Sequence, residues 1–326
     1  MKGLLLLLVL LEGFSLTSSI ELGVMYYVKP DQSTKCPGQP CETLSYYLDN
    51  VNSTVNQHKN VTMVFLNGEH TVNVSIAIAT ITTPVITMVG ESKNQVVLGK
   101  RYFPTFVVFY NNTEVCLKNL VMISCIVEGY SDKLEPTKFQ MLSVKLLSLC
   151  MFQIEFNLDT DSQAFIEHVT VLEGGELALP IHSVLNACKF QDFSILIPVG
   201  STFEINDSIF INAPINVQGS NINVSGDTLF STSYQESALT VYLSTITLSG
   251  NVTFADNTGI RGGAMALYSS TLIIAPGTIT TFTNNSAQHK GGAIYIEPGI
   301  VPSVVCLLYT SPSPRDATLS RMPSSA

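Results

Sequence analysis

The sequence predicts an all-β fold, a parallel β-helix (solenoid) with a short N-terminal helical cap. Three features lead to this prediction: short segments of alternating apolar residues, turn residues between them, and a longer motif that recurs near the C-terminal end. An amphipathic helix would need apolar residues three and four positions apart, and these segments lack that spacing. A long sequence period predicts a solenoid, because each unit buries its apolar face only against the next.

Composition and charge narrow the class of protein. Of the 326 residues, 46% are hydrophobic and 13% are charged, with 16 Lys and Arg against 25 Asp and Glu. The hydrophobic share supplies a core and excludes a disordered charged tail. The formal net charge of -9 provides no positive field for a phosphate backbone, so we expect no nucleic-acid partner.

Residues 1–19 have the pattern of a secretory signal peptide. Lys2 precedes the apolar run 4–11, and Thr17 and Ser19 place small residues where a signal peptidase cleaves. The run is shorter than the ~20 residues that span a bilayer. We therefore expect a secreted or extracellular protein that begins near Ile20, with no membrane span within this chain.

Residues 20–60 are predicted to form the N-terminal cap. Leu44, Tyr47, Leu48 and Val51 are spaced as one apolar face of a helix. We expect this helix to cover the first coil, because a bare solenoid end presents unpaired strand edges. A helix that binds a partner protein is the alternative.

The cysteines indicate an oxidising compartment. Seven are present, and an even number remains when Cys306 is assigned to the C-terminal tail. Cys36 and Cys41 flank the turn-rich sequence Pro-Gly-Gln-Pro, so we predict a disulfide between them. The other disulfide candidates, which allow three pairings, are Cys116, Cys125, Cys150 and Cys188.

Eight Asn-x-Ser/Thr sequons support an extracellular address, because such sites accept glycans on exposed backbone. Some of them arise by chance in a chain rich in Asn, Ser and Thr. The candidate glycosylation sites are Asn52, Asn60, Asn73, Asn111, Asn206, Asn223, Asn251 and Asn284.

Strands with one buried face are expected in the region 61–304. In residues 203–205, 215–217 and 222–224, two apolar residues flank a polar one, and in residues 209–211 two isoleucines flank a phenylalanine. This period-two pattern predicts that the flanking pair of each segment is buried. Asn, Asp, Ser, Pro and Gly stand between the segments and favour turns.

Two copies of a longer motif lie near the C-terminal end. Residues 254–257 and 282–285 both read Phe-x-x-Asn, and residues 262–264 and 291–293 both read Gly-Gly-Ala. The offset between the two glycine pairs exceeds the offset between the two phenylalanines by a single position. Each unit contains three strand-like pieces, which one turn of a triangular coil requires.

These residue types suit a β-helix, in which each strand pairs with its counterpart ~4.8 Å away and like residues stack on like. Phe254 is predicted to lie over Phe282 inside the coil. Asn257 over Asn285 is predicted to share amide hydrogen bonds at a corner. The glycine pairs provide positive φ or a close backbone approach at another corner. A Gly-Gly pair in any tight loop is the simpler interpretation.

The paired motif closely resembles the repeats of the chlamydial polymorphic outer membrane proteins (Pmp-type). The resemblance implies a right-handed parallel β-helix of the pectin-lyase-like kind and a role in surface display and adhesion. Segments 64–70, 86–90 and 117–121 also resemble successive coil openings of pectin-lyase-like proteins. The motif residues are Phe254, Asn257, Gly262, Gly263, Ala264, Phe282, Asn285, Gly291, Gly292, Ala293 and Ile294, and Met265 departs from the pattern.

The function favoured by these features is non-catalytic adhesion or extracellular matrix interaction, with extracellular proteins or glycans as partners. The alternative is a pectin-lyase-like carbohydrate-active enzyme, a polysaccharide hydrolase or lyase that uses Asp159 and Asp161. A solvated turn is the simpler explanation of that acidic pair. The histidines are scattered singly, so we expect neither a metal site nor a cofactor.

Residues 305–326 lose the strand pattern and become rich in Ser, Pro and Arg. This stretch resembles a translated sequencing adapter. We therefore expect residues 305–326 to be a non-native or disordered tail. We also expect that the natural protein is tethered to a surface through a region absent from this chain.

Overall fold

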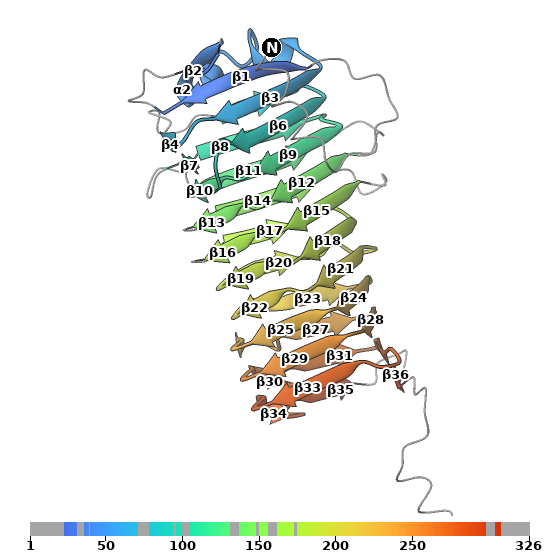
Figure 1. Ribbon diagram of the computed structural model, residues 1–326. Helices are drawn as coiled ribbons and strands as arrows, with labels where there is room; N and C mark the ends of the chain where they lie inside the picture. The colour runs from blue at the N-terminus through green and yellow to red at the C-terminus, as the bar shows by residue number, and fades with distance from the viewer. Residues whose placement is uncertain are drawn as a thin grey trace, which may run out of the picture.

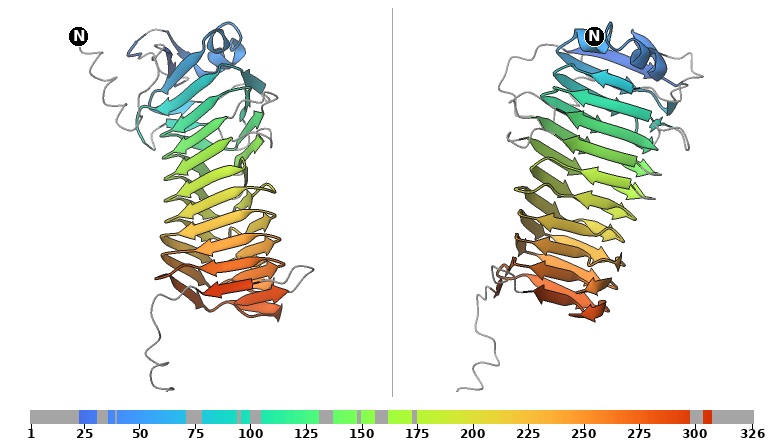
Figure 2. Two further views of the ribbon diagram at one scale, coloured as in Figure 1. Left: turned by 90° about the vertical axis from the view of Figure 1, so that its right-hand side faces the viewer. Right: turned by 180° about the vertical axis from the view of Figure 1, so that it is seen from behind.

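The computed structural model describes residues 23–30, 36–38, 40–70, 78–93, 96–99, 105–130, 137–147, 150–155, 162–172, 175–297 and 304–307. They form a right-handed parallel β-helix, in which successive turns of the chain add strands to three long parallel sheets. Figure 1 shows the turns stacked from the blue N-terminal end to the orange C-terminal end, and Figure 2 shows the other sides of the stack. The predicted fold class is confirmed.

Two of the long sheets, sheet A and sheet B, hold 13 and 10 strands. In spatial order sheet A contains β2 (Cys41–Thr43), β1 (Val24–Lys29), β3 (Asn60–Phe65), β6 (Val85–Gly90), β9 (Glu114–Lys118), β12 (Lys138–Leu142), β15 (Gln163–Glu167), β18 (His182–Asn186), β21 (Thr202–Asn206), β24 (Asn221–Ser225), β28 (Thr245–Leu248), β32 (Thr271–Ile274) and β36 (Val304–Leu307). Sheet B contains β4 (Gly68–His70), β7 (Val96–Leu98), β10 (Val121–Ile123), β13 (Lys145–Leu147), β16 (Thr170–Leu172), β19 (Lys189–Gln191), β22 (Ile209–Ile211), β25 (Asp227–Ser231), β29 (Asn251–Ala255) and β33 (Ile279–Thr283).

The third long sheet, sheet C, holds 10 strands, and a minor sheet of three strands, which the sequence did not predict, widens the last coils. Sheet C contains β5 (Ile78–Ile81), β8 (Thr105–Tyr110), β11 (Cys125–Tyr130), β14 (Cys150–Glu155), β17 (Gly175–Ala178), β20 (Ser194–Leu196), β23 (Ile215–Gln218), β27 (Leu239–Tyr242), β31 (Met265–Tyr268) and β35 (Ile294–Glu297). The minor sheet contains β26 (Tyr234–Gln235), β30 (Thr258–Arg261) and β34 (Ser286–Lys290).

Aromatic rings stack inside the coil along sheet B. Phe254 pairs in register with Phe282, and their ring centroids are 5.2 Å apart with an interplanar angle of 6°. The stack continues through Phe230, Phe210 and Phe190 with centroid distances of 4.9, 4.8 and 5.3 Å. Stacked rings of this kind stabilise each other beyond the area that they bury. The predicted Phe254–Phe282 stack is confirmed.

Two polar ladders satisfy backbone groups at the corners. The Asn257 amide Nδ2 donates to Asn285 Oδ1 at 2.9 Å and to the Phe230 carbonyl at 3.0 Å. Asn257 is fully buried, and its Oδ1 accepts from the Ser233 N–H. A second ladder, in which each backbone N–H donates to the serine hydroxyl of the next coil, comprises Ser201, Ser220, Ser244 and Ser270.

The Gly-Gly pairs occupy a tight corner, as predicted. Gly262 and Gly291 have φ of 67° and 74°, in the left-handed region that favours glycine. Gly263 is required for a different reason, because a Cβ atom there would lie 2.3 Å from the backbone oxygen of Ser286.

One strand has the opposite phase to the prediction. Phe210 is buried, whereas Ile209 is 37% exposed and Ile211 is only half-buried. The reason is that Phe210 extends the stack between Phe190 and Phe230, which outweighs the inward placement of two smaller side chains. The predicted pairs in 203–205, 215–217 and 222–224 are buried.

The N-terminal cap consists of helix α2 (Leu44–Asp49) and the 3-10 helix η1 (Val55–Gln57). Thr43 is the N-cap of α2, and its hydroxyl accepts a hydrogen bond from the Tyr46 N–H. Leu44 and Tyr47 of α2, and Val51 in the turn after it, are buried in the same core as the coil interior, so the helix and this turn cover the first coil (Figure 1). The helix ends at Asp49, before the predicted Val51, and the side chain of Leu48 lies outside the described residues.

The sheet extends beyond both predicted limits of the solenoid. At the start, β1 and β2 within residues 20–60 already belong to sheet A. At the end, β36 pairs with β32, so Val305, Cys306 and Leu307 continue the sheet instead of belonging to the tail. The predicted signal peptide and the rest of the tail lie outside the described residues.

Candidate binding groove on the outer face of sheet A

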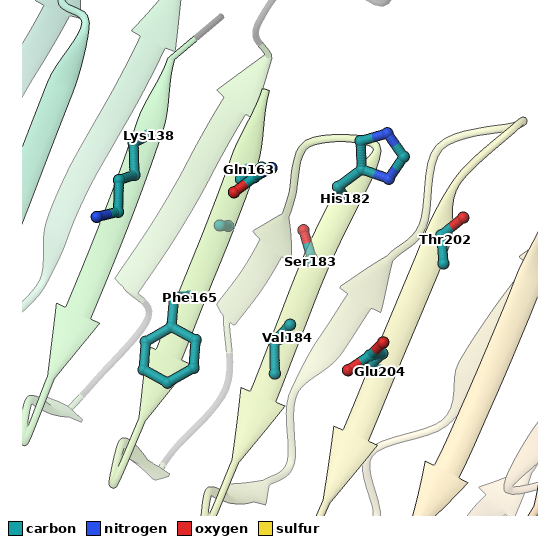
Figure 3. Close-up of a pocket in the computed structure, with 9 residues that line it drawn as sticks. Lys138, Gln163, Phe165, His182, Ser183, Val184, Thr202 and Glu204 are labelled. Carbon is teal, nitrogen blue, oxygen red and sulfur yellow. The ribbon is translucent and has the colours of Figure 1, made fainter. Parts of the chain in front are cut away.

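A groove of about 310 Å³ lies on the outer face of sheet A across β12, β15, β18 and β21 (Figure 3). In-register pairing aligns the first residue of each of these strands and, separately, the third. Because side chains alternate along a strand, both rows point away from the coil interior. The lining residues are Lys138, Gln163, Ala164, Phe165, His182, Ser183, Val184, Thr202 and Glu204.

The floor of the groove is apolar and its rim is polar. Phe165 and Val184 are half-buried neighbours on β15 and β18, in one row with Glu204. The first-residue row places Lys138 beside Gln163, followed by His182 and Thr202 (Figure 3). This set offers ammonium, amide, imidazole and hydroxyl groups around one aromatic face.

Charges in the groove are few. The ammonium of Lys138 lies 4.0 Å from the Glu114 carboxylate on β9. Glu204 is the one carboxylate among the lining residues that the structure describes. Glycoside hydrolysis uses a pair of carboxyl groups ~5 to 9.5 Å apart, and these lining residues do not supply that pair. Asp159 and Asp161, the predicted acidic pair, lie outside the described residues.

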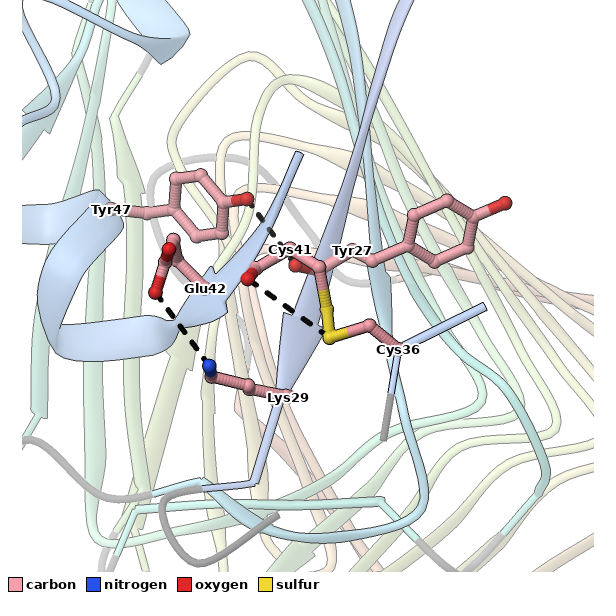
Figure 4. The surroundings of a disulfide bond; sticks show 6 residues. All are labelled: Tyr27, Lys29, Cys36, Cys41, Glu42 and Tyr47. Carbon is pink, nitrogen blue, oxygen red and sulfur yellow. Dashed lines mark hydrogen bonds and ion pairs between the residues drawn. A yellow bond between two sulfur atoms is a disulfide. The ribbon is translucent and has the colours of Figure 1, made fainter. Parts of the chain in front are cut away.

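The predicted Cys36–Cys41 disulfide is confirmed (Figure 4), with a Cα–Cα distance of 6.2 Å. It closes the loop that precedes β2. The Tyr47 hydroxyl of α2 donates to the Tyr27 carbonyl of β1 at 3.3 Å, and an ion pair of 3.7 Å joins Lys29 of β1 to Glu42 of β2. The bridge therefore fastens the loop at Cys36 to the first residue of β2.

The four other candidate cysteines are free, buried thiols in the structure. Cys116 lies on the outer face of β9, and burial raises its pKa to about 11. Cys188 lies inside the coil between β18 and β19, and burial raises its pKa to about 12. Cys125 and Cys150 begin β11 and β14 on neighbouring coils.

The sequons are distributed over the outer surface. Asn52, Asn223, Asn251 and Asn284 are exposed, whereas Asn60, Asn111 and Asn206 are half-buried; Asn73 lies outside the described residues. The Nδ2 atoms of Asn251 and Asn284 donate to Asp227 at 2.8 Å and to Asp256 at 3.2 Å. Glycosylation of these sites stays a prediction.

Sequence reasoning missed the groove residues because the length of the coils varies. His182 pairs with Gln163 one coil before it, and Thr271 pairs with Thr245 in the same way, but the second pair is further apart along the chain. Without a constant period, the outward rows cannot be aligned from the sequence. The available signal was Phe165, a large apolar residue between inward-facing Ala164 and Ile166.

Among the described residues, no three His, Cys, Asp or Glu side chains gather into a group that could hold a metal ion. No helix within the described ranges is long and apolar enough to cross a membrane.

Comparison with known proteins identifies the repeat. Residues 279–297 match the Chlamydia polymorphic membrane protein repeat. This segment contains the second copy of the motif, Phe282 to Ile294, so the resemblance is confirmed there. No curated protein matches the sequence.

Two solved structures are similar to this chain. ORF18 of Geobacillus virus E2 is 12% identical with a TM-score of 0.48, and the match covers 81% of this chain and 58% of the viral chain. The A-module of the mannuronan C-5 epimerase AlgE4 from Azotobacter vinelandii is 11% identical with a TM-score of 0.44, and the match covers 82% of this chain and 90% of that module. The chain therefore spans 58% of the length of the viral protein.

Proposed function

We propose that this chain is a secreted or cell-surface β-helix protein that adheres to a glycan through the groove on sheet A and catalyses no reaction on it. The observation that carries the proposal is the half-buried Phe165 in a polar-rimmed groove on the outer face of a stacked scaffold. The Cys36–Cys41 bridge supports an oxidising compartment. The match to a membrane-protein repeat supports a surface location.

A sugar ring is the ligand that this groove suits best. Its apolar face stacks on an aromatic ring, and its hydroxyls both donate and accept hydrogen bonds. Phe165 supplies the ring, Gln163 and Thr202 supply donors and acceptors, and Glu204 supplies an acceptor. Binding sites of this kind combine an apolar floor with a few oriented polar groups.

The charge balance favours a neutral glycan over an acidic one. Glu114 pairs with Lys138 and compensates its charge, Glu204 adds a negative charge to the groove, and the whole chain carries a formal charge of -9. The negative field of the chain repels sulfated or uronic-acid polymers at a distance.

Binding of the full-length chain to immobilised neutral and acidic polysaccharides, followed by calorimetric titration of the tightest ligand, tests this proposal. Phe165→Ala is expected to weaken binding about tenfold, because losing the stacked ring removes ~1.4 kcal/mol. Thr247→Ala is the matched control, because Thr247 lies in the same outward row four coils away. Equal affinities of the two variants, or saturable binding to an extracellular protein but to no glycan, would contradict the proposal.

The absence of catalysis is tested separately on the same polysaccharides. The intact chain is expected to leave their chain length unchanged over hours, as measured by size-exclusion chromatography. Depolymerisation by the intact chain that is lost in Asp159→Asn would support the enzyme alternative instead.

A further inference from the structure

Cys125 and Cys150 lie directly beside each other on neighbouring coils. They are the first residues of β11 and β14, whose next residues, Ile126 and Met151, pair in register. Adjacent strands are ~4.8 Å apart, which is within the Cα–Cα range of ~4.4 to 6.8 Å that a disulfide spans. The backbone N–H of Cys125 points at Cys150 Sγ, and the nitrogen and sulfur are 3.5 Å apart.

The side chain of Cys150 points toward the coil that contains Cys125. It lies 3.5 Å from the Met122 carbonyl oxygen of that coil. The sulfur of Cys125 lies 3.4 Å from the Ile123 carbonyl oxygen of its own coil and 3.7 Å from the Leu98 carbonyl oxygen of the preceding coil. A rotation about the Cα–Cβ bond of Cys125, away from the preceding coil, is therefore the movement that brings the two sulfurs together.

Neighbouring positions within the described coils offer these thiols no competing sulfur. On the next coil the in-register position of Cys150 is Gly175, which has no side chain. On the preceding coil the in-register position of Cys125 is Thr105. Cys125 and Cys150 are 2% and 1% exposed, so external thiols cannot reach them in the folded coil.

Distance or orientation excludes every bridge among the four cysteines other than Cys125–Cys150. Cys116 on β9 and Cys188 after β18 are three coils apart, a separation of ~14 Å along the stack. Cys116 also points out of sheet A, whereas Cys125 and Cys150 lie in the core. Cys188 lies at the corner that leads into sheet B, away from sheet C.

We propose that Cys125 and Cys150 form a second disulfide that covalently joins two neighbouring coils in the secreted protein, while Cys116 and Cys188 stay reduced. The co-reactant is a disulfide of the oxidising compartment, either a small-molecule disulfide or that of a thiol oxidoreductase.

The reaction is a double thiol–disulfide exchange. One of the two cysteine thiolates attacks one sulfur of the external disulfide, forms a mixed disulfide and releases one external thiolate. The thiolate of the other cysteine then attacks the cysteine sulfur of this mixed disulfide and releases the second external thiolate. Overall two protein thiols are oxidised, two protons leave them, and the external disulfide is reduced to two thiols. Burial requires that this occur during folding, before the coils close.

Mass spectrometry of the full-length chain, made in an oxidising secretory compartment, tests the proposal. The protein is denatured without reductant, alkylated with iodoacetamide and digested. Peptides with Cys116 and Cys188 are expected to carry the alkyl group, and peptides with Cys125 and Cys150 are expected to be linked until a reductant is added. Alkylation of Cys125 and Cys150 without reduction, or their linkage to other cysteines, would overturn the proposal.

A second measurement does not depend on digestion. Cys150→Ser is expected to lower the urea midpoint of the oxidised protein, and this difference is expected to shrink when both proteins are reduced. Cys116→Ser, which breaks no proposed bridge, serves as the matched control. An equal midpoint shift of Cys150→Ser under oxidising and reducing conditions would assign the residue a packing role alone and overturn the bridge.

Discussion

Replacing Phe254 by alanine tests the internal stack at a fully buried ring. Phe254 is fully buried, and its ring lies between those of Phe230 and Phe282 at 4.9 and 5.2 Å. A buried Phe→Ala change costs about 3–5 kcal/mol. The change also removes two ring pairs. Each pair adds about 0.5–1.5 kcal/mol when the cost of the buried Phe→Ala change does not already include it. The free energy of unfolding of Phe254→Ala is therefore expected to fall by about 3–8 kcal/mol, the lower part of the range applying when the cost of the Phe→Ala change already includes the ring pairs.

Phe282→Ala is the internal comparison. Phe282 is only half-buried and stacks on one neighbour in the described chain, so its loss is expected to cost about 1–3 kcal/mol. Urea denaturation followed by circular dichroism measures both variants, and hydrogen exchange locates the coils that lose protection. Equal costs for the two variants, or a cost below about 1 kcal/mol for Phe254→Ala, would refute the stacked interior.

Three further predictions concern the corners and the buried thiol. Asn257→Ala is expected to lower the free energy of unfolding by about 2–5 kcal/mol, because it leaves the Ser233 N–H and the Phe230 carbonyl without their hydrogen-bond partner. Unchanged hydrogen-exchange protection at Ser233 would contradict the ladder. Gly263→Ala is expected to unfold the last coils, because the added Cβ would lie 2.3 Å from a backbone oxygen. Gly292→Ala is expected to leave the melting temperature unchanged in the same thermal melt, because its added Cβ has no neighbour closer than 4.0 Å. The folded state raises the pKa of Cys188 from 9.0 to about 12. Its contribution to stability is therefore complete below pH ~9 and falls by up to ~1.4 kcal/mol per pH unit between pH ~9 and 12, and urea melts of Cys188→Ala are expected to lack this part of the alkaline loss.

The C-terminal coils could be predicted from the sequence because their motif occurs twice with nearly constant spacing. The offsets of Phe254 to Phe282 and of Asn257 to Asn285 are equal, so a stack of like on like followed directly. The same spacing indicated a tight corner at the Gly-Gly pairs. The Cys36–Cys41 bridge was predictable because a short turn between the two cysteines holds their sulfurs close whatever the remaining fold.

The groove and the phase of β22 could not be predicted, because both depend on neighbouring coils that are not periodic in the sequence. Which residue of 209–211 is buried is decided by Phe190 and Phe230, one coil away on either side. Phe165 joins Val184 and Glu204 only after coils of unequal length are aligned. The proposed Cys125–Cys150 bridge likewise could not be selected from the three candidate pairings without the stacking order of the coils.

Distances between pairs of spin labels on sheet A, measured by double electron–electron resonance, test most directly whether the coils stack in register. Thr271 carries one label, and the second is placed in turn at His182, Gln163 and Lys138, which are four, five and six coils away in the same outward row, with Cys306 replaced by serine. At ~4.8 Å per coil the expected distances are about 19, 24 and 29 Å. Distances that do not increase by this step from one pair to the next would contradict the stacked solenoid.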